Sequence, residues 1–519
     1  MTALSLKTRI NRQTGAFILA LGLLAFGGIA VFYYATPEGL ALNDDSIAYI
    51  AGARSILAGQ GYREAWLLSN EPMTHWPPGF PGMLAFIGWL LKIDPLRAAR
   101  ALNGALFGLN SILMAYLAWR MTRSRLAGIL ASVLFILNVS LLEIHVNAMS
   151  EPLYMFLTLL AFSTFDLYFD KKKIPWLVLT GVLVGLAYLS RYAAVSLLAT
   201  LLVVLFIFHE KWQKRVVDAV LLLVSALPFI LLWSYRNYAV TGNATNRQFG
   251  WHPIELENWR LGVETVSAFL MPVAPWRTSL LKIPFLVEGF IIALFVVLLI
   301  WVLRVGLPRF FAPRSTKRPE SLPFFNGLYI FGYLSVLIAT MTLFDPATKF
   351  QVRIISPVYA SLILLLISLI VWVFKKQATI GRYIAVVLVI FLLGISAFSQ
   401  FGYVKNLSRS GYKFASPNWY AAESIEYIRA LPEETIVYSN EAGVVYLYSG
   451  RSANVIPKTE EGIQAMRRQV RRGKAVIALF RVNDVDEETF LFYYMVLGRN
   501  LVREDFSRDW IFVSPRNKR

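Results

Sequence analysis

Long apolar segments separated by short polar ones fill the first 400 residues of the chain. An α-helix needs about 20 apolar residues to cross the hydrocarbon core of a bilayer. The segments near that length are 16–35, 98–119, 126–142, 152–169, 175–190, 193–208, 217–235, 285–303, 323–343, 355–374 and 383–400. The pattern predicts an α-helical polytopic membrane protein with about eleven transmembrane helices.

Lysine and arginine gather between these segments, which is typical of the cytoplasmic side of a membrane. The clusters are Lys7, Arg9 and Arg12; Arg120, Arg123 and Arg125; Lys171, Lys172 and Lys173; Lys211, Lys214 and Arg215; Arg304, Arg309, Arg314, Lys317 and Arg318; and Lys375, Lys376 and Arg382. If all of them are cytoplasmic, the N-terminus is inside and the chain emerges outside after residue 400.

The first apolar segment resembles a secretory signal peptide because basic residues precede it. No small-residue cleavage site follows, and Phe32-Tyr33-Tyr34 suits an aromatic anchor at the membrane interface. The segment is therefore interpreted as a transmembrane helix.

The first outer loop, from about residue 36 to about residue 97, contains a short apolar stretch at 79–91. Trp76-Pro77-Pro78 directly before it and Pro81 within it do not suit the entry of a regular spanning helix. We expect this stretch to lie in the outer interface as a helix. A second interfacial helix is expected at 44–58.

Beyond residue 400 the chain becomes more polar and alternates short strands with helices. Expected strands are 434–439, 474–480 and 510–514, and expected helices are 417–428, 460–472 and 487–497. This pattern predicts two domains, a transmembrane domain at 1–400 and an extracytoplasmic α/β domain at 401–519. The second has no Gly-rich phosphate loop and no nucleophile motif, so we expect it to support the first domain or to recognise an acceptor.

Composition narrows the class of protein. Hydrophobic residues make up 57% of the 519 residues, and the mean hydropathy of +0.54 is too high for a soluble protein. The chain has no cysteine, which excludes thiol catalysis and thiolate metal sites. The net charge of +19 lies mostly in the loops between apolar segments, so it indicates membrane orientation and not nucleic acid binding.

The candidate site begins at Asn43-Asp44-Asp45, just beyond the first apolar segment. A carboxylate beside a bilayer is costly unless it faces water or protein, so the pair is a functional candidate. The alternative is that both residues merely favour the start of a helix. Several other polar residues fall on the same outer side of the membrane, although none of them was used to assign the topology. The full set, including the acidic pair, is Asp44, Asp45, His75, Glu143, His145, Glu151, Arg191, Arg236, Asp345, Lys349 and Arg353.

Each of these candidates has a structural alternative. Glu151 precedes Pro152 at the start of a predicted span and suits a helix N-terminus. Arg191 is at a tight outer turn, where arginine often reaches to the interface. Lys349 and Arg353 could clamp a phosphate or anchor a helix end.

A divalent metal cation is a further alternative. His75 and His145 are potential ligands, with Asp44, Asp45 and Glu151 as carboxylate ligands, although their spacing follows no known metal motif. No cofactor is therefore assigned.

The residues resemble those of the GT-C glycosyltransferases, above all the protein O-mannosyltransferase and aminoarabinose transferase groups, over about residues 1–375. The acidic pair, then Tyr49, then Gly59-Gln60-Gly61-Tyr62, follows their pattern. His75-Trp76-Pro77-Pro78-Gly79 looks like their His-Pro-Pro-Leu stretch with Trp76 inserted. Ser150-Glu151-Pro152 and Val352-Arg353-Ile354 are similar to their second-loop acid and late arginine motifs.

The resemblance implies an inverting transfer of a sugar from a polyprenyl-phosphate donor to an acceptor hydroxyl at the outer membrane face. Asp44 then matches the catalytic base, Asp45 stands where the family often has Glu, and Glu151 matches the second-loop acid. Arg353 is implied as a contact to the donor phosphate. His75, Tyr49, Arg191 and Lys349 are the other expected substrate-binding residues, and the acceptor is a protein, a lipid or a glycan.

This function suits the chemistry of the residues, because a base and nearby cations are sufficient when the leaving group is a phosphate. A transporter or lipid-linked sugar flippase would require polar residues within the spans or on both faces of the membrane. Broken helices and an internal repeat would also be expected. A membrane assembly protein would not need the outer cluster of charges. The expected location is the plasma (inner) membrane.

Overall fold

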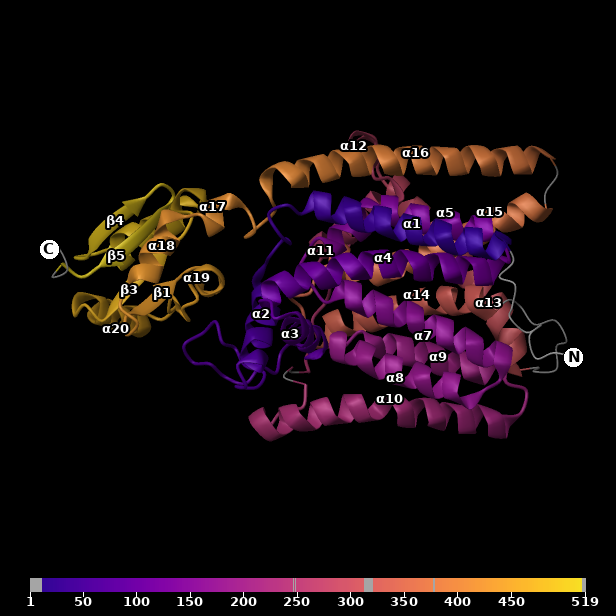
Figure 1. Ribbon diagram of the computed structural model, residues 1–519, viewed down its shortest axis with the longest axis horizontal. Coiled ribbons are helices and arrows are strands. Elements are labelled where there is room, and N and C mark those ends of the chain that lie inside the picture. The colour runs from indigo at the N-terminus through magenta and orange to yellow at the C-terminus, as the bar shows by residue number, and fades with distance from the viewer. Residues whose placement is uncertain (1–11, 246, 248, 312–320, 377–378, 516–519) are drawn as a thin grey trace, which may run out of the picture. The chain divides into compact units, whose positions relative to one another are not determined.

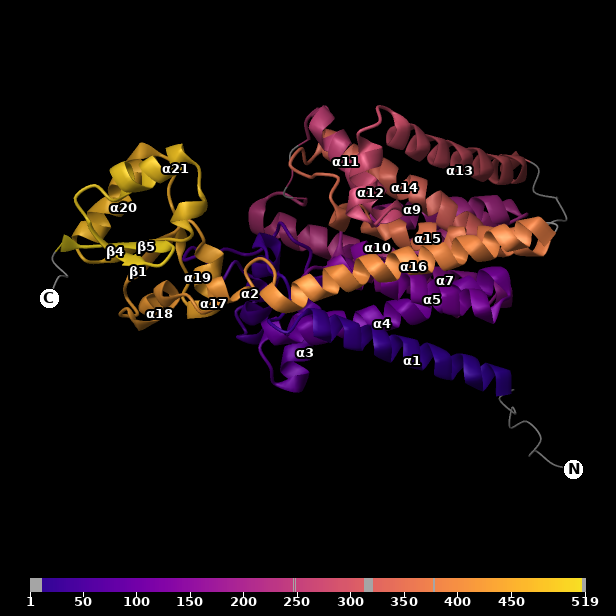
Figure 2. The same cartoon turned by 90° about the horizontal axis from the view of Figure 1, so that it is seen from above.

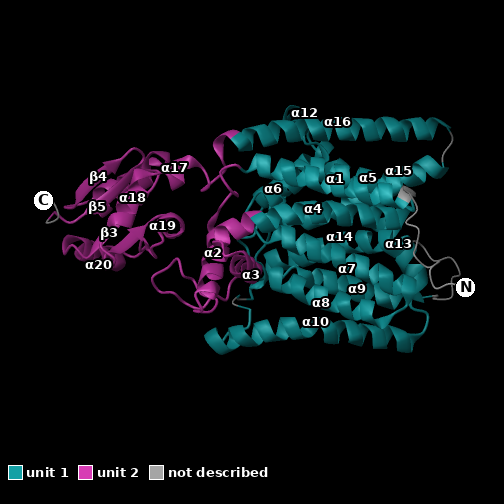
Figure 3. Ribbon diagram, viewed as in Figure 1, with its two compact units in different colours: residues 1–36, 77–80, 101–408 teal, residues 37–76, 81–100, 409–519 magenta. Residues whose placement is uncertain are grey.

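The structure is a computed structural model that describes residues 12–245, 247, 249–311, 321–376 and 379–515. It divides into two compact units (Figure 3). Unit 1 comprises residues 1–36, 77–80 and 101–408, and unit 2 comprises residues 37–76, 81–100 and 409–519. Of the basic residues assigned to the cytoplasmic side, Lys7, Arg9, Arg314, Lys317 and Arg318 lie outside the described residues.

Unit 1 is a bundle of long helices that run side by side (Figure 1, Figure 2). Its long and short helices are α1 (Arg12–Ala35), α4 (Pro95–Thr122), α5 (Arg125–Leu137), α6 (Val139–His145), α7 (Glu151–Lys171), α8 (Ile174–Ser190), α9 (Ala194–Phe208), α10 (Trp212–Thr241), α11 (Leu256–Leu270), α12 (Ala274–Leu281), α13 (Leu286–Phe311), α14 (Ser321–Leu343), α15 (Val352–Lys376) and α16 (Thr379–Ser410). Residues 95–100 of α4 and the last two residues of α16 belong to unit 2.

All eleven predicted spans are helical. Among the described residues, eight helices are long and apolar enough to cross a membrane, and α5 with α6 forms a ninth candidate bent by 65°. The remaining two segments are the shorter apolar helices α8 and α9. The polytopic helical architecture is therefore confirmed, while the number of crossings stays a prediction.

Burial separates the central helices of unit 1 from the peripheral ones. In the most apolar stretch of α7, 78% of the residues are buried, and in α4 67%, whereas the values are 6% in α13 and 11% in α16. A helix that is apolar on an uncovered surface is suited to lipid. α13 and α16 are therefore suited to face lipid, whereas α4 and α7 lie in the interior of unit 1.

Two glycines four residues apart let α8 approach α10 closely. A Cβ at Gly181 would lie 2.4 Å from Ser225 Cβ, and one at Gly185 would lie 2.4 Å from Phe229 Cδ2. Small residues at this spacing allow membrane helices to pack backbone to backbone. This contact was not predicted from the sequence.

Unit 2 contains the interfacial helices and the C-terminal residues. Its helices are α2 (Asp44–Leu57), most of α3 (Gly79–Leu91), α17 (Pro417–Tyr420), α18 (Glu423–Ala430), α19 (Ala442–Ser449), α20 (Glu460–Arg471) and α21 (Glu487–Leu491), followed by the π-helical turn Phe492–Leu497. Its strands are β1 (Ile436–Ser439), β2 (Asn454–Val455), β3 (Ala475–Leu479), β4 (Val502–Phe506) and β5 (Asp509–Val513).

The five strands form one sheet in the order β2-β1-β3-β5-β4. β1 is parallel to β2 and β3, and β5 is antiparallel to β3 and β4. The predicted strands correspond to β1, β3 and β5, whereas β2 and β4 were missed. β2 has only two residues, too few for a pattern, and β4 carries the charges of Arg503, Glu504 and Asp505.

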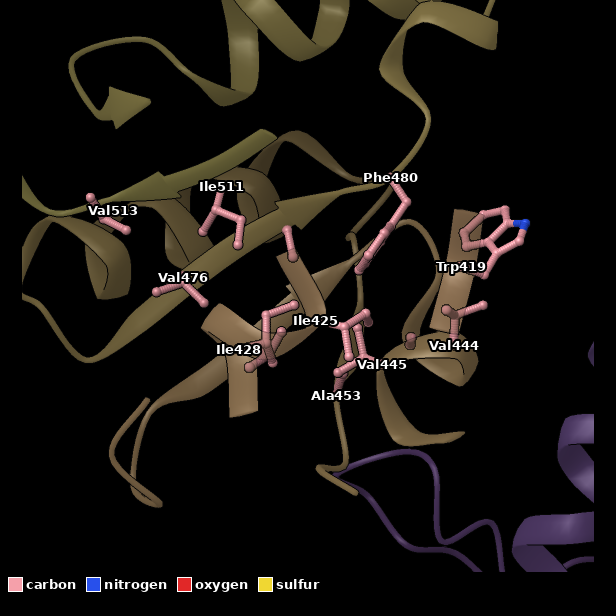
Figure 4. Packing of buried hydrophobic residues seen from close by; sticks show 13 residues of the cluster. Trp419, Ile425, Ile428, Val444, Val445, Ala453, Val476, Phe480, Ile511 and Val513 are labelled. Atoms are coloured by element: carbon pink, nitrogen blue, oxygen red, sulfur yellow. The ribbon is translucent and has the colours of Figure 1, made fainter. Parts of the chain in front are cut away.

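Both faces of this sheet are covered, because side chains alternate along each strand. From β3, Val476 and Ala478 join one hydrophobic cluster while Ile477 and Leu479 join the other. Figure 4 shows the first cluster, in which side chains from α17, α18 and α19 pack against β3 and β5. The C-terminal part of unit 2 is thus a three-layer α/β/α domain.

The first outer loop is bound to this α/β domain within unit 2. Leu42 pairs with Lys413 and Leu67 with Ala453 in short parallel bridges, and Tyr420 Oη donates a hydrogen bond of 2.6 Å to Glu38. Unit 2 therefore combines residues from near the N-terminus (37–76 and 81–100) with the C-terminal residues 409–519. The domain boundary at residue 400 stays a prediction.

Candidate active site

α2 begins with an asparagine cap. Asn43 Oδ1 accepts hydrogen bonds from Ser46 N at 3.0 Å and from Ser46 Oγ at 2.9 Å. Asp44 and Asp45 occupy the first turn, where a negative charge is favoured by the helix dipole. Neither carboxylate is required as the cap, so both side chains are available for other contacts.

The two carboxylates have different surroundings. Asp44 is exposed, whereas Asp45 is half-buried and accepts a hydrogen bond of 3.2 Å from Trp76 Nε1. Trp76 is held in turn by Tyr62 Oη, which donates to its carbonyl at 3.2 Å, and by the edge-on ring of His75. The inserted tryptophan of the His-Trp-Pro-Pro motif thus orients Asp45.

Tyr49 and His75 lie in contrasting positions within unit 2. Tyr49 is 4% exposed and lies within the buried middle of α2. His75 is exposed beside Trp76. Their expected roles in substrate binding stay predictions.

α2 packs directly on α19 of the α/β domain. A Cβ at Gly443 would lie 2.6 Å from Ile47 Cδ1, so a larger residue would require Ile47 to shift. Glu441 precedes α19, and burial together with the negative charge of Asp44 raises the pKa of Glu441 to about 7, although Arg481 opposes the shift. Nothing in the sequence pattern singled out Glu441.

In unit 1, Glu151 and Arg191 form a buried ion pair. Arg191 Nη1 lies 2.6 Å from Glu151 Oε1, and the side chains are 16% and 0% exposed. The contact is ionic without hydrogen-bond geometry, and neither carboxylate oxygen accepts a hydrogen bond from the part of the chain that is described. Glu151 is thus more than a helix-start acid, and Arg191 does not merely reach to the interface.

Two asparagines of α4 hold the backbone that leads to Glu151. Asn103 donates to the carbonyls of His145 and Asn147 at 3.0 and 2.7 Å, and Asn110 donates to the carbonyl of Pro152 at 3.2 Å. Both asparagines are fully buried. The sequence analysis did not identify these two asparagines. The available signal was their spacing, since a polar residue recurs after seven positions on one face of an apolar helix.

His145 is a structural residue. Its Nδ1 lies 2.7 Å from the carbonyl of Leu141 and its Nε2 lies 3.1 Å from Asn110 Nδ2, so both ring nitrogens have partners. The ring packs against Phe107 and Phe135. The hypothesis that His145 is a metal ligand is therefore wrong in this structure, because neither nitrogen is available.

The start of α15 lies near the Glu151–Arg191 pair. Tyr333 of α14 interacts electrostatically with both members of the pair and donates a hydrogen bond of 2.5 Å to the carbonyl of Ile354. Arg353, the second residue of α15, is half-buried. The helix dipole disfavours a positive charge in the first turn of a helix. A bound anion beside Arg353 would interact favourably with both the dipole and the guanidinium group.

The loop before α15 is held by α11 and by an ion pair. Asp345 pairs with Arg247, and Asn258 of α11 accepts from Phe350 N at 2.8 Å and donates to the carbonyl of Thr348 at 3.1 Å. Lys349 between them is exposed. The backbone on both sides of Lys349 is thus held by α11, while its side chain is exposed.

The remaining outer polar residues serve local contacts. Arg236 stacks its guanidinium 5.1 Å from the centre of the Trp233 ring, and the carbonyl of Glu143 accepts from Asn147 at 2.6 Å. No group of three or more His, Asp or Glu that could hold a metal ion is found among the described residues. Asp44, Asp45, Tyr49 and His75 belong to unit 2, and Glu151, Arg191, Lys349 and Arg353 belong to unit 1.

Comparisons with known proteins agree with this architecture. Residues 79–241 match the model of the dolichyl-phosphate-mannose-protein mannosyltransferase family. No curated protein matches by sequence. Among solved structures, ArnT from Cupriavidus metallidurans bound to undecaprenyl phosphate is similar over 96% of this chain and 98% of its own, with 12% identity and a TM-score of 0.60.

The archaeal oligosaccharyltransferase AglB from Archaeoglobus fulgidus, in complex with an inhibitory peptide and a dolichol-phosphate, is also similar. It aligns over 96% of this chain and 74% of its own, with 12% identity and a TM-score of 0.55. The resemblance drawn from the motifs is confirmed at the level of fold: this multi-pass membrane protein shares its fold with ArnT and AglB, and residues 79–241 match the mannosyltransferase family model.

Proposed function

We propose that the protein is an inverting glycosyltransferase that moves a sugar from a polyprenyl-phosphate donor to an acceptor hydroxyl at the outer face of the plasma (inner) membrane. The observation that carries the proposal is the exposed Asp44 carboxylate at the start of α2, on a chain with the GT-C fold. The N-terminus is then cytoplasmic and the α/β domain extracytoplasmic.

In this reaction the acceptor oxygen attacks the anomeric carbon while the bond from that carbon to the phosphate oxygen breaks. The polyprenyl phosphate leaves with the bonding electrons, and Asp44 takes the hydroxyl proton as general base. Attack opposite the leaving phosphate inverts the anomeric centre. A phosphate is a competent leaving group, so the chain needs no strong general acid.

The other candidate residues have supporting roles in the proposal. Asp45, oriented by Trp76, keeps the first turn of α2 in place and adds negative charge beside the base. Glu151 fixes Arg191 at the end of α8, and Arg353 with Lys349 stabilises the charge that develops on the phosphate. His75 and Tyr49 are the other substrate-binding residues in this proposal.

Similar proteins support the choice of donor. The ArnT structure carries undecaprenyl phosphate and the AglB structure carries a dolichol-phosphate, both of them polyprenyl phosphates. The AglB structure also contains an inhibitory peptide, so a protein is included among the possible acceptors together with a lipid and a glycan. A flippase or a membrane assembly protein remains the alternative to transfer.

The test compares the wild type with Asp44→Asn on a panel of radiolabelled polyprenyl-phosphate sugars, with acceptor-containing membranes present. We expect turnover of at least one donor by the wild type and its loss in the variant at an unchanged melting temperature. Asp94→Asn is the matched control for losing an acidic residue in the same unit, since Asp94 pairs with Arg54 and not with the site. A fully active Asp44→Asn variant overturns the base assignment. If the wild type consumes no donor, a flippase is favoured.

A further inference from the structure

The contact between α2 and α19 places a second acidic residue beside Asp44. Asp44 and Ile47 are three residues apart, so they share one face of α2. Ile47 lies against Gly443 near the start of α19. Asp44 is one turn before Ile47 on this face. It is therefore near Glu441, the residue that precedes α19.

The backbone around Glu441 is held firmly. Asn440 donates to the carbonyl of Phe480 at 3.0 Å and accepts from Phe480 N at 2.9 Å, so its side chain continues the hydrogen bonding of β1 with β3. The amide of Glu441 donates to Ser439 Oγ at 3.0 Å. A side chain on such a fixed backbone can position a neighbour, whereas one on a mobile loop cannot.

The charged and titratable groups around Glu441 are few. Asp44 faces it from α2, Arg481 from the segment after β3, and Tyr493 from the π-helical turn. Arg481 is itself engaged, because it pairs with Asp484 at 2.5 Å and stacks on the Trp419 ring at 5.5 Å. The main charge that acts on Glu441 is therefore that of Asp44.

We propose that Glu441 is a positioning residue for Asp44, through which the α/β domain takes part in the transfer reaction. The inference rests on the proposed function, in which Asp44 is the base. Like charges at short range repel one another, so the charge on Glu441 acts on the charge at Asp44.

Glu441 then controls how strongly the pair attracts the proton of the acceptor. Burial and the charge of Asp44 hold the pKa of Glu441 at about 7, so its proton is lost near neutral pH. When it is lost, a second negative charge stands beside Asp44 and favours the transfer of the acceptor proton to Asp44. We expect the rate of transfer to rise with pH across this transition.

The test measures transfer by the full-length protein in detergent, from about pH 5 to about pH 9, for the wild type and for Glu441→Gln. We expect the variant to lose the transition near neutral pH. Its kcat should fall about tenfold above the transition, while the KM for the polyprenyl-phosphate sugar stays unchanged. Glu434→Gln, which replaces an exposed glutamate of the same domain, should behave as the wild type.

A second measurement does not depend on activity. The melting temperatures of Asp44→Asn, Glu441→Gln and the double variant at alkaline pH form a double-mutant cycle, in which a direct interaction makes the two effects non-additive. Additive effects overturn the pairing. If the wild type is active and Glu441→Gln keeps its pH profile, the role of Glu441 is overturned alone. If the wild type turns over no donor, the proposed function fails and the role of Glu441 fails with it, even where the cycle shows coupling.

Discussion

Arg191 Nη1 lies 2.6 Å from Glu151 Oε1, and the Glu151 carboxylate is fully buried. This ion pair joins the start of α7 to the end of α8. Removing one member of a buried pair leaves a charge without compensation, which usually costs more than the pair itself contributes.

We therefore expect Arg191→Leu to destabilise the protein by about 3 to 5 kcal/mol. The double variant Arg191→Leu with Glu151→Leu should recover most of this loss, because no buried charge then remains. Thermal unfolding of the purified protein in detergent measures both. An Arg191→Leu variant as stable as the wild type would show that water reaches Glu151 in solution.

A second prediction concerns the close approach of α2 and α19. Gly443→Ala places a Cβ 2.6 Å from Ile47 Cδ1, and we expect a loss of about 1 to 3 kcal/mol through overpacking. The loss should be smaller when Ile47 is also alanine, because the opposing methyl groups are gone. Gly82→Ala on α3, where a Cβ would meet nothing within 4 Å, is the control and should be neutral or slightly stabilising.

These two contacts show what the sequence can and cannot predict. The helix that starts at Glu151 follows from apolar length and from Pro152, since both are local patterns. Its pairing with Arg191 joins residues 40 positions apart. No periodicity marks such a partner, so the sequence predicted both residues but not their contact.

The same limit applies to the C-terminal residues. The sequence predicted an α/β domain because strands β1, β3 and β5 are apolar runs of sufficient length. That α19 would pack on α2, about 400 residues earlier, has no local signal apart from a single glycine. Glu441 was overlooked for this reason, whereas Asp44 was visible as an acid beside an apolar segment.

The hydrogen bond from Trp76 to Asp45 leads to a third prediction. Trp76→Phe keeps most of the ring and removes the donor, so we expect a loss of about 1 kcal/mol in stability and a lower rate of sugar transfer. Asp45→Asn should lower the rate similarly, and the double variant should be no slower than either single one. Trp89→Phe, at an exposed position of α3, is the control. Additive losses of rate would separate the roles of Trp76 and Asp45.

The raised pKa of Glu441 predicts how stability depends on pH. A carboxyl whose pKa rises from 4.5 to about 7 on folding binds its proton more tightly in the folded state. Its contribution to stability is therefore complete below pH 4.5 and is lost as the pH rises through 7. Between these limits we expect the wild type to lose about 2 kcal/mol through this group, a value reduced from the full shift because Glu441 is partly exposed.

Glu441→Gln removes the titrating group, so the variant should be as stable as the wild type or less stable at acidic pH, and more stable at alkaline pH. The crossing of the two stability curves identifies Glu441 more surely than the size of either effect, because other groups titrate equally in both proteins. Thermal unfolding as a function of pH, with Glu434→Gln as the control, measures it. Parallel curves would mean that Glu441 has an ordinary pKa, and the α/β domain would then hold α2 through packing at Gly443 without sharing its charge.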